Sequence, residues 1–127
     1  MQRCCPLQRI EASRCPPLYQ AKAEFFRTLG HPARIRILEL LVQRDHAVHE
    51  LLDAIEIEPS NLSQQLAVLR RAGLVSQHRG AGEVVYSVSV PQVGDLLLTA
   101  RQILLGIIAE QDVLKAELGP AGPGREQ

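Results

Sequence analysis

The sequence has few aromatic residues and no net charge. It has no tryptophan and only two tyrosines and two phenylalanines among 127 residues. We therefore do not expect a protein that binds single-stranded nucleic acid by stacking successive bases on a row of rings. Fourteen Lys and Arg balance fourteen Asp and Glu. This balance excludes a general attraction of the chain to polyanions, so any contact with nucleic acid must come from a local patch.

Long hydrophobic runs are also missing. The longest strongly apolar run without a charge is 103–109, which is far below the roughly 20 residues that a membrane-spanning helix needs. The first 17 residues contain no continuous apolar stretch of the kind that a secretory signal has. The three cysteines, Cys4, Cys5 and Cys15, are confined to one end and do not form a disulfide framework. We therefore expect a cytoplasmic protein that makes no contact with a membrane.

The motifs of several enzyme classes are absent too. The sequence has no Gly-rich phosphate loop, no Gly-x-Ser-x-Gly and no His-Glu-x-x-His. The nearest approach is His46-x-x-His49-Glu50, which lacks a third ligand at a known spacing. We expect no catalytic activity and no required cofactor.

Composition divides the chain into three segments, of which one is a domain. Residues 1–17 hold cysteine and proline without periodicity and predict a flexible arm, and 119–127 are a Gly/Pro-rich tail. Within 18–118, apolar spacing predicts helices at 18–29, 32–43, 47–55 and 60–72. The period then changes. A strand-like run at 74–79, a turn at 80–82 and a run at 84–90 that alternates with period two predict a β-hairpin, followed by a long helix over 92–118. The expected fold is mainly α with a small β-hairpin, in the order ααααββα.

The helix expected at 60–72 has an unusual polar face. Leu62, Leu66 and Leu69 fall together on one side. The opposite side and its flanks carry uncharged hydrogen-bonding residues, namely Ser60, Asn61, Ser63, Gln64 and Gln65. Such side chains can pair with base edges in the major groove or anchor the helix. A short helix and a tight connection precede this segment, which is the pattern of a helix-turn-helix.

The charge around this helix favours contact with phosphates. No Asp or Glu occurs between 59 and 82, where Arg70, Arg71, Arg79 and His78 are found. An acid-free window beside a polar helix predicts a surface that faces the DNA backbone. A hairpin directly after such a helix is a wing, and Arg79 beside its turn would reach a minor groove or the backbone. A plain helical bundle with one solvated helix is the alternative.

These segments resemble the ArsR/SmtB family of dimeric winged-helix repressors over about 18–118. The resemblance is carried by LGHPARIRIL at 29–38, by SNLSQQLAVLRRAGLV at 60–75 and by the wing that ends in Val85-Tyr86. The second stretch is similar to the family pattern Ser-x-x-His-Leu-x-x-Leu-x-x-x-Gly-Leu-Val. Gln65 stands where histidine is usual, and it can still donate and accept hydrogen bonds. Glu83 stands where the wing often has a basic or amide residue, which would weaken contact at the tip.

The last expected helix points to a dimer. It carries more leucine and isoleucine than one small winged helix can cover, and a second copy would bury the excess. The resemblance implies the same, because family members are homodimers through their first and last helices. The interface residues expected here are Tyr19, Phe26, Leu97, Leu104, Ile107 and Ile108. Two recognition helices would then meet half-sites about 34–36 Å apart. A core buried entirely within one chain is the alternative.

Neither metal site of the family is matched. One family site uses cysteines of the third helix, but the matching positions here are Ala47 and His49. The other uses an aspartate and a histidine at the start of the last helix, and here Asp95 is present but Leu97 stands in place of the histidine. Two weak possibilities for a metal or metalloid ion remain. One is His46 with His49, expected at i, i+3 on a short helix. The other is the thiol group of Cys4, Cys5 and Cys15, which instead suits a redox input or no function at all.

The sequence thus predicts a homodimeric regulator, in the first place a repressor, that binds an operator in double-stranded DNA. The alternative is a winged helix that binds another protein and no DNA, since fold alone does not fix function. The acid-free window argues against that alternative.

Overall fold

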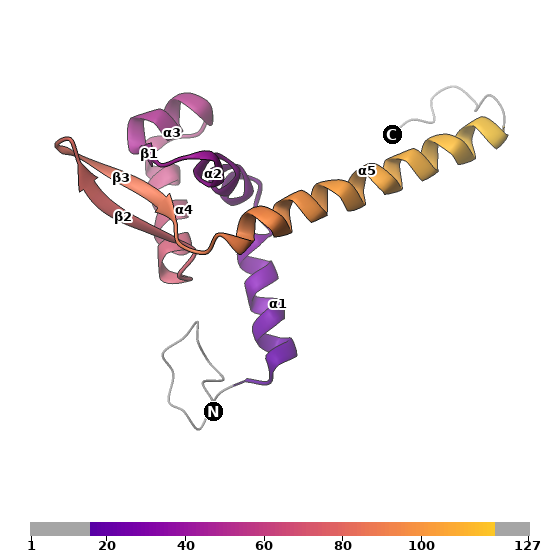
Figure 1. Ribbon diagram of the computed structural model, residues 1–127, viewed down its shortest axis with the longest axis horizontal. Coiled ribbons are helices and arrows are strands. Elements are labelled where there is room, and N and C mark those ends of the chain that lie inside the picture. The colour runs from indigo at the N-terminus through magenta and orange to yellow at the C-terminus, as the bar shows by residue number, and fades with distance from the viewer. Residues whose placement is uncertain (1–15, 119–127) are drawn as a thin grey trace. The chain divides into compact units, whose positions relative to one another are not determined.

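The computed structural model describes residues 16–118. The predicted arm and tail, with all three cysteines, lie almost entirely outside these residues. Two compact units divide between Gly94 and Asp95. In chain order the elements are α1 (Leu18–Leu29), α2 (Pro32–Gln43), β1 (His46–Ala47), α3 (Val48–Ala54), α4 (Pro59–Arg71), β2 (Val75–Gly80), β3 (Glu83–Val88) and α5 (Gln92–Leu118) (Figure 1). The five predicted helices and the hairpin are confirmed.

One strand was not predicted. Residues 46 and 47, expected at or just before the start of the third helix, form β1 instead, and the sheet has the order β1-β3-β2. His46 is opposite Tyr86 and Ala47 is opposite Val85, in antiparallel register. The order ααααββα is therefore incomplete. A two-residue strand is too short to show a period of two, and it forms because the outer edge of β3 offers free backbone groups.

Local sequence explains where the helices begin and end. At the start of α2, Pro32 needs no hydrogen-bond acceptor, and His31 Nδ1 accepts the Ala33 N–H at 3.2 Å. At the start of α3, the Glu50 carboxylate accepts the Ala47 N–H at 2.9 Å. That bond, with nearby Arg44, holds the pKa of Glu50 below its usual value. Gly73 follows α4 with a φ of 80°, which glycine adopts at low cost.

The hairpin turn is built from two residues, Ala81 and Gly82, both with positive φ. This combination is the type I′ turn that matches the right-handed twist of two paired strands. The β2–β3 ladder runs from the pair Val75–Val88 to the pair Gly80–Glu83. Figure 1 shows the hairpin extending from the helical part of the first unit, as the wing of a winged helix does.

The core of the first unit lies between α2, α3, α4 and the sheet. Its fully buried side chains are Ile37, Leu38, Leu41, Leu51, Leu62 and Leu69. Val93, in the first turn of α5, is buried as well. A methyl group on Gly94 would come within 3.0 Å of a Val42 methyl, so a glycine here lets this turn approach α2 closely.

The second unit consists, among the described residues, of α5 from Asp95 to Leu118, so no other element of that unit covers it. By length and composition alone, the 27-residue α5 is apolar enough to cross a membrane. This helix does not stand out in the sequence when only uncharged runs are considered. A helix of this composition can pack against lipid or against the apolar surface of a protein.

Candidate nucleic-acid interface

The polar side of α4 is divided between exposed and buried residues. The apolar side, with Leu62, Leu66 and Leu69, is buried, and it fixes the helix on the core. Ser60, Ser63 and Gln64 are exposed, and Asn61 is half-buried. Because the buried leucines set the rotation of α4, three of the five predicted polar residues face solvent from its first two turns.

Gln65 is different, because only 7% of its surface is exposed. Its Oε1 accepts a hydrogen bond from Arg34 Nε at 2.7 Å, and its Nε2 donates to Asn61 Oδ1 at 2.8 Å. Arg34 is held in turn by a bond from Nη1 to the Thr28 carbonyl at 3.0 Å. Of the two roles that the sequence left open for Gln65, the geometry favours anchoring the helix.

Sequence reasoning missed Arg34 as a functional candidate. It lies in α2, 31 residues before its partner Gln65, and it is half-buried. The only available signal was a glutamine next to the leucine face of α4, because a buried amide at such a position needs a hydrogen-bond partner. No local pattern says which residue supplies that partner.

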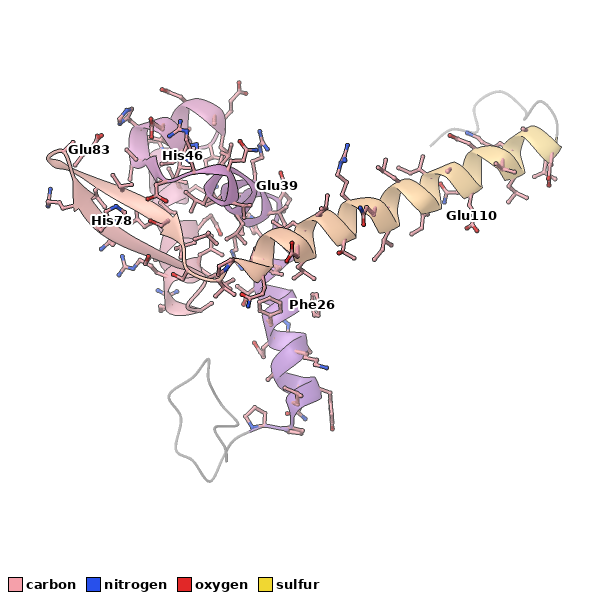
Figure 2. The ribbon with its side chains drawn as sticks, in the orientation of Figure 1. Phe26, Glu39, His46, His78, Glu83 and Glu110 are labelled. Atoms are coloured by element: carbon pink, nitrogen blue, oxygen red, sulfur yellow. The ribbon has the colours of Figure 1, made fainter. Side chains whose placement is uncertain are left out.

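The wing carries two more of the predicted residues, His78 and Arg79. Arg79 is exposed and donates from Nη1 to the Gly82 carbonyl at 3.5 Å, across the turn. His78 is exposed, with Nε2 3.9 Å from an Asp45 carboxylate oxygen. Glu83 Oε1 lies 3.4 Å from His49 Nδ1. Figure 2 shows Glu83 at the turn and His78 farther down the hairpin.

Ion pairing distinguishes three arginines outside the acid-free window from the three inside it. Within residues 16–118, Arg27, Arg36 and Arg44 each lie within 4 Å of a glutamate oxygen. Arg70, Arg71 and Arg79 have no such partner among the same residues. All three are exposed. The acid-free window of the sequence thus holds three exposed arginines whose charge no carboxylate of residues 16–118 pairs with, which suits phosphate binding.

The structure does not assemble a metal site from the two histidine candidates. His46 is buried on β1, with Nδ1 2.9 Å from the Arg44 carbonyl, whereas His49 is exposed on α3. The prediction that both lie on one helix was wrong, because α3 begins at Val48. In the described part of the chain, no three His, Cys, Asp or Glu side chains cluster in a way that suits an ion. The candidates Cys4, Cys5 and Cys15 lie outside it.

The predicted interface residues are mostly uncovered within their own units. Tyr19 and Phe26 on α1 are exposed, although both are large and apolar; Figure 2 labels Phe26 on this helix. Leu104, Ile107 and Ile108 on α5 are exposed, and Leu97 is half-buried. Exposed apolar side chains in such number are typical of a surface that binds a partner.

The chain is similar to known bacterial regulators. Residues 31–77, from α2 to β2, match the model of the bacterial regulatory protein, arsR family. Over 107 residues the chain is 50% identical to "Uncharacterized HTH-type transcriptional regulator Rv0081" of Mycobacterium tuberculosis strain H37Rv. The match covers 84% of this chain and 94% of that relative.

The fold of this chain is also similar to solved structures of bacterial transcriptional regulators. The crystal structure of M. tuberculosis Rv0081 matches with a TM-score of 0.70 and 54% identity, covering 76% of this chain and 97% of that one. The transcriptional repressor BigR of Xylella fastidiosa matches with a TM-score of 0.63 and 32% identity, covering 67% and 87%. Both likenesses extend beyond the helix-turn-helix itself.

Proposed function

We propose that this chain, which belongs to the ArsR family of bacterial regulatory proteins, represses transcription as a cytoplasmic homodimer bound to an operator. By its membership of that family, the chain is a DNA-binding winged-helix transcriptional regulator and not an enzyme. The observation that carries this proposal is the surface made by α4 and the wing. It combines exposed amide and hydroxyl groups with arginines that have no acidic partner within residues 16–118. The relative BigR is named a transcriptional repressor, which supports the direction of control.

In this proposal the residues of α4 read the operator. Ser60, Ser63 and Gln64 lie on the exposed side of the first two turns, where the recognition helix of a helix-turn-helix contacts base edges. Gln65 holds the helix in place from the buried side. Arg70 and Arg71, in the last turn, and His78 and Arg79, on the wing, contact phosphates or the adjacent minor groove.

The second copy in this proposal covers the apolar surface of α5, together with Tyr19 and Phe26 of α1. Leu104, Ile107 and Ile108 repeat at i, i+3 and i+4, which aligns them on one face of the helix. A lipid bilayer would suit α5 less well, because Asp95, Arg101 and further charges towards its end would enter the apolar layer. A two-fold dimer instead leaves these charges in water and brings two copies of α4 to one duplex.

DNA binding in this proposal needs no ion. The rotation of α4 is set by its buried leucines and by the Arg34–Gln65 hydrogen bond, which are contacts between protein side chains. A metal or metalloid ion, if one acts, would therefore modulate binding instead of creating the surface. The thiols of Cys4, Cys5 and Cys15 are the candidates for such an ion or for a redox input.

The test of base reading is the substitution Gln64→Ala. Loss of a bidentate contact is expected to cost about 1–3 kcal/mol on operator DNA and nothing on random duplex. Fluorescence anisotropy titrations on both duplexes, at one stated salt concentration, measure the difference. The matched control is Gln77→Ala, which removes an exposed amide of β2 outside the proposed reading set. An equal loss on both duplexes would refute the base-reading role of Gln64.

A second prediction concerns Arg79→Ala. Each phosphate contact contributes about −0.9 to the slope of log affinity against log salt, so the slope is expected to become shallower by about one unit, and all sequences to weaken alike. Arg36→Ala is the control, since the Glu39 carboxylate 3.1 Å away already compensates that charge. An unchanged slope would exclude a phosphate contact. A wild-type chain with no salt-dependent duplex binding would favour the protein-binding alternative.

A further inference from the structure

A chain of two side-chain hydrogen bonds runs from α2 to the first turn of α4. Arg34 Nε donates to Gln65 Oε1 at 2.7 Å, and Gln65 Nε2 donates to Asn61 Oδ1 at 2.8 Å. The Thr28 carbonyl accepts a bond from Arg34 Nη1 at 3.0 Å and so holds the guanidinium in place. Gln65, the middle member, is 7% exposed, so water does not readily replace either of its bonds.

The direction of this chain is fixed by its first member. An arginine side chain only donates, at any pH that a folded protein meets. The end of the Gln65 amide that faces Arg34 must therefore be its oxygen, and the end that faces Asn61 must be its NH₂ group. Asn61 consequently turns its oxygen inward. Reversal of any member would place two donors or two acceptors against each other in a buried site, which is strongly unfavourable.

We propose that Arg34 is a positioning residue for sequence recognition, because through Gln65 it makes Asn61 present NH₂ donors, and not its carbonyl oxygen, to DNA. The inference rests on the proposed function and deepens it. Asn61 is the third residue of α4 and is half-buried, and its Nδ2 makes no hydrogen bond with any residue from 16 to 118. The residues at the start of a recognition helix are the ones that reach base edges.

The ligand of Asn61 in this proposal is a hydrogen-bond acceptor on the duplex. In the major groove guanine offers two acceptors, N7 and O6, whereas cytosine offers only the N4 donor. A free asparagine amide can turn to suit either base, but one held from behind cannot. The operator position next to Asn61 should therefore favour guanine over cytosine. A phosphate oxygen has the same chemistry, and the experiment separates the two sources.

Two substitutions invert the group that faces DNA by different routes. In Asn61→Asp, one carboxylate oxygen keeps the bond from Gln65 and the other faces outward as an acceptor. In Gln65→Glu, the new carboxylate accepts from both neighbours, so Asn61 must turn its NH₂ inward and its oxygen outward. Gln77→Glu, at an exposed position of β2, adds the same charge without altering the hydrogen bonds among Arg34, Gln65 and Asn61, and is the matched control.

The readout is the affinity of each variant for a set of duplexes that differ from the operator by one base pair. If Asn61 meets a base, both inverting variants lose the guanine preference at one shared position by about tenfold and gain affinity for cytosine there. If it meets a phosphate, both weaken every duplex alike, and more than Gln77→Glu does. Either result supports the proposal and identifies the acceptor.

Two results would overturn it. A Gln65→Glu variant that behaves like Gln77→Glu, while Asn61→Asp does not, would show that Gln65 does not orient Asn61. If both inverting variants behave like the control, Asn61 does not face DNA. Arg34→Met removes the fixed donor without inverting anything, so it should broaden the preference at the same position. An unchanged preference in that variant would also contradict the positioning role.

The direction of the hydrogen bonds from Arg34 through Gln65 to Asn61 is measured separately in the free protein, by side-chain amide hydrogen exchange in NMR spectra. The Gln65 NH₂ should exchange slowly and the Asn61 NH₂ rapidly in the wild type. In Gln65→Glu the Asn61 NH₂ should become the slow one. Slow exchange of the Asn61 NH₂ in the wild type would refute the proposed direction. Failure of the wild type to bind any duplex would refute the proposed function, whatever the exchange pattern.

Discussion

Replacement of Ile107 by glutamate is expected to convert the proposed dimer into monomers and to weaken operator binding by about a hundredfold or more. Ile107 is exposed on α5, between Leu104 and Ile108 on the proposed interface. A two-fold axis would bury the new carboxylate once in each subunit, without a partner for either, and burial of an unpaired charge is costly. A monomer engages one half-site at a time, and loss of the link between two sites forfeits a factor of about 10²–10⁴.

Sedimentation equilibrium at micromolar concentration measures the first effect, and titration of a two-half-site duplex measures the second. Gln102→Glu is the matched control, because at 100° per residue Gln102 falls on the opposite side of α5 from Leu104 and Ile107. A dimer that survives Ile107→Glu would place the interface elsewhere. A wild-type chain that is monomeric in solution and binds lipid vesicles through α5 would favour the membrane alternative.

The helices of this protein were predictable because their apolar residues follow the helical period over several turns. The bounds of α1, α2 and α5 agree with the sequence expectation. Gly30 marks the end of α1, and Pro32 and Pro91 mark the starts of α2 and α5 in the sequence. The hairpin was predictable for a similar reason, since Gly80, Ala81 and Gly82 separate a strand-like run from a run that alternates with period two. Such signals are local, so one sequence suffices to detect them.

The features that were not predictable depend on distant partners. β1 exists because β3, almost 40 residues later, offers an edge to His46 and Ala47. The burial of Gln65 depends on Arg34, which lies on another helix. A helical projection places Gln65 beside the polar face of α4 but does not show that a neighbouring helix covers it. The polar composition of the exposed side of α4 could therefore be predicted, whereas the burial of Gln65 could not.

The apolar face of α4 should dominate the stability of the proposed recognition surface, and Leu62→Ala is the substitution that tests it. Leu62 is fully buried, directly between the proposed DNA-contacting residues Asn61 and Ser63. Truncation removes apolar contact and leaves a cavity, which is expected to lower the free energy of unfolding by about 2–5 kcal/mol. Chemical denaturation at one fixed chain concentration measures the loss, because the stability of a dimer depends on concentration.

Gln64→Ala is the matched control for that loss, since it truncates an exposed side chain two residues away and should change stability by less than about 0.5 kcal/mol. The pair also separates two causes of weak DNA binding. Gln64→Ala should impair operator binding with stability intact, whereas Leu62→Ala should impair it by loosening the whole helix, so that operator and random duplex are affected together. A loss of stability below about 1 kcal/mol for Leu62→Ala would mean that this leucine does not fix α4 on the core, and that the rotation assigned to its polar face needs another cause.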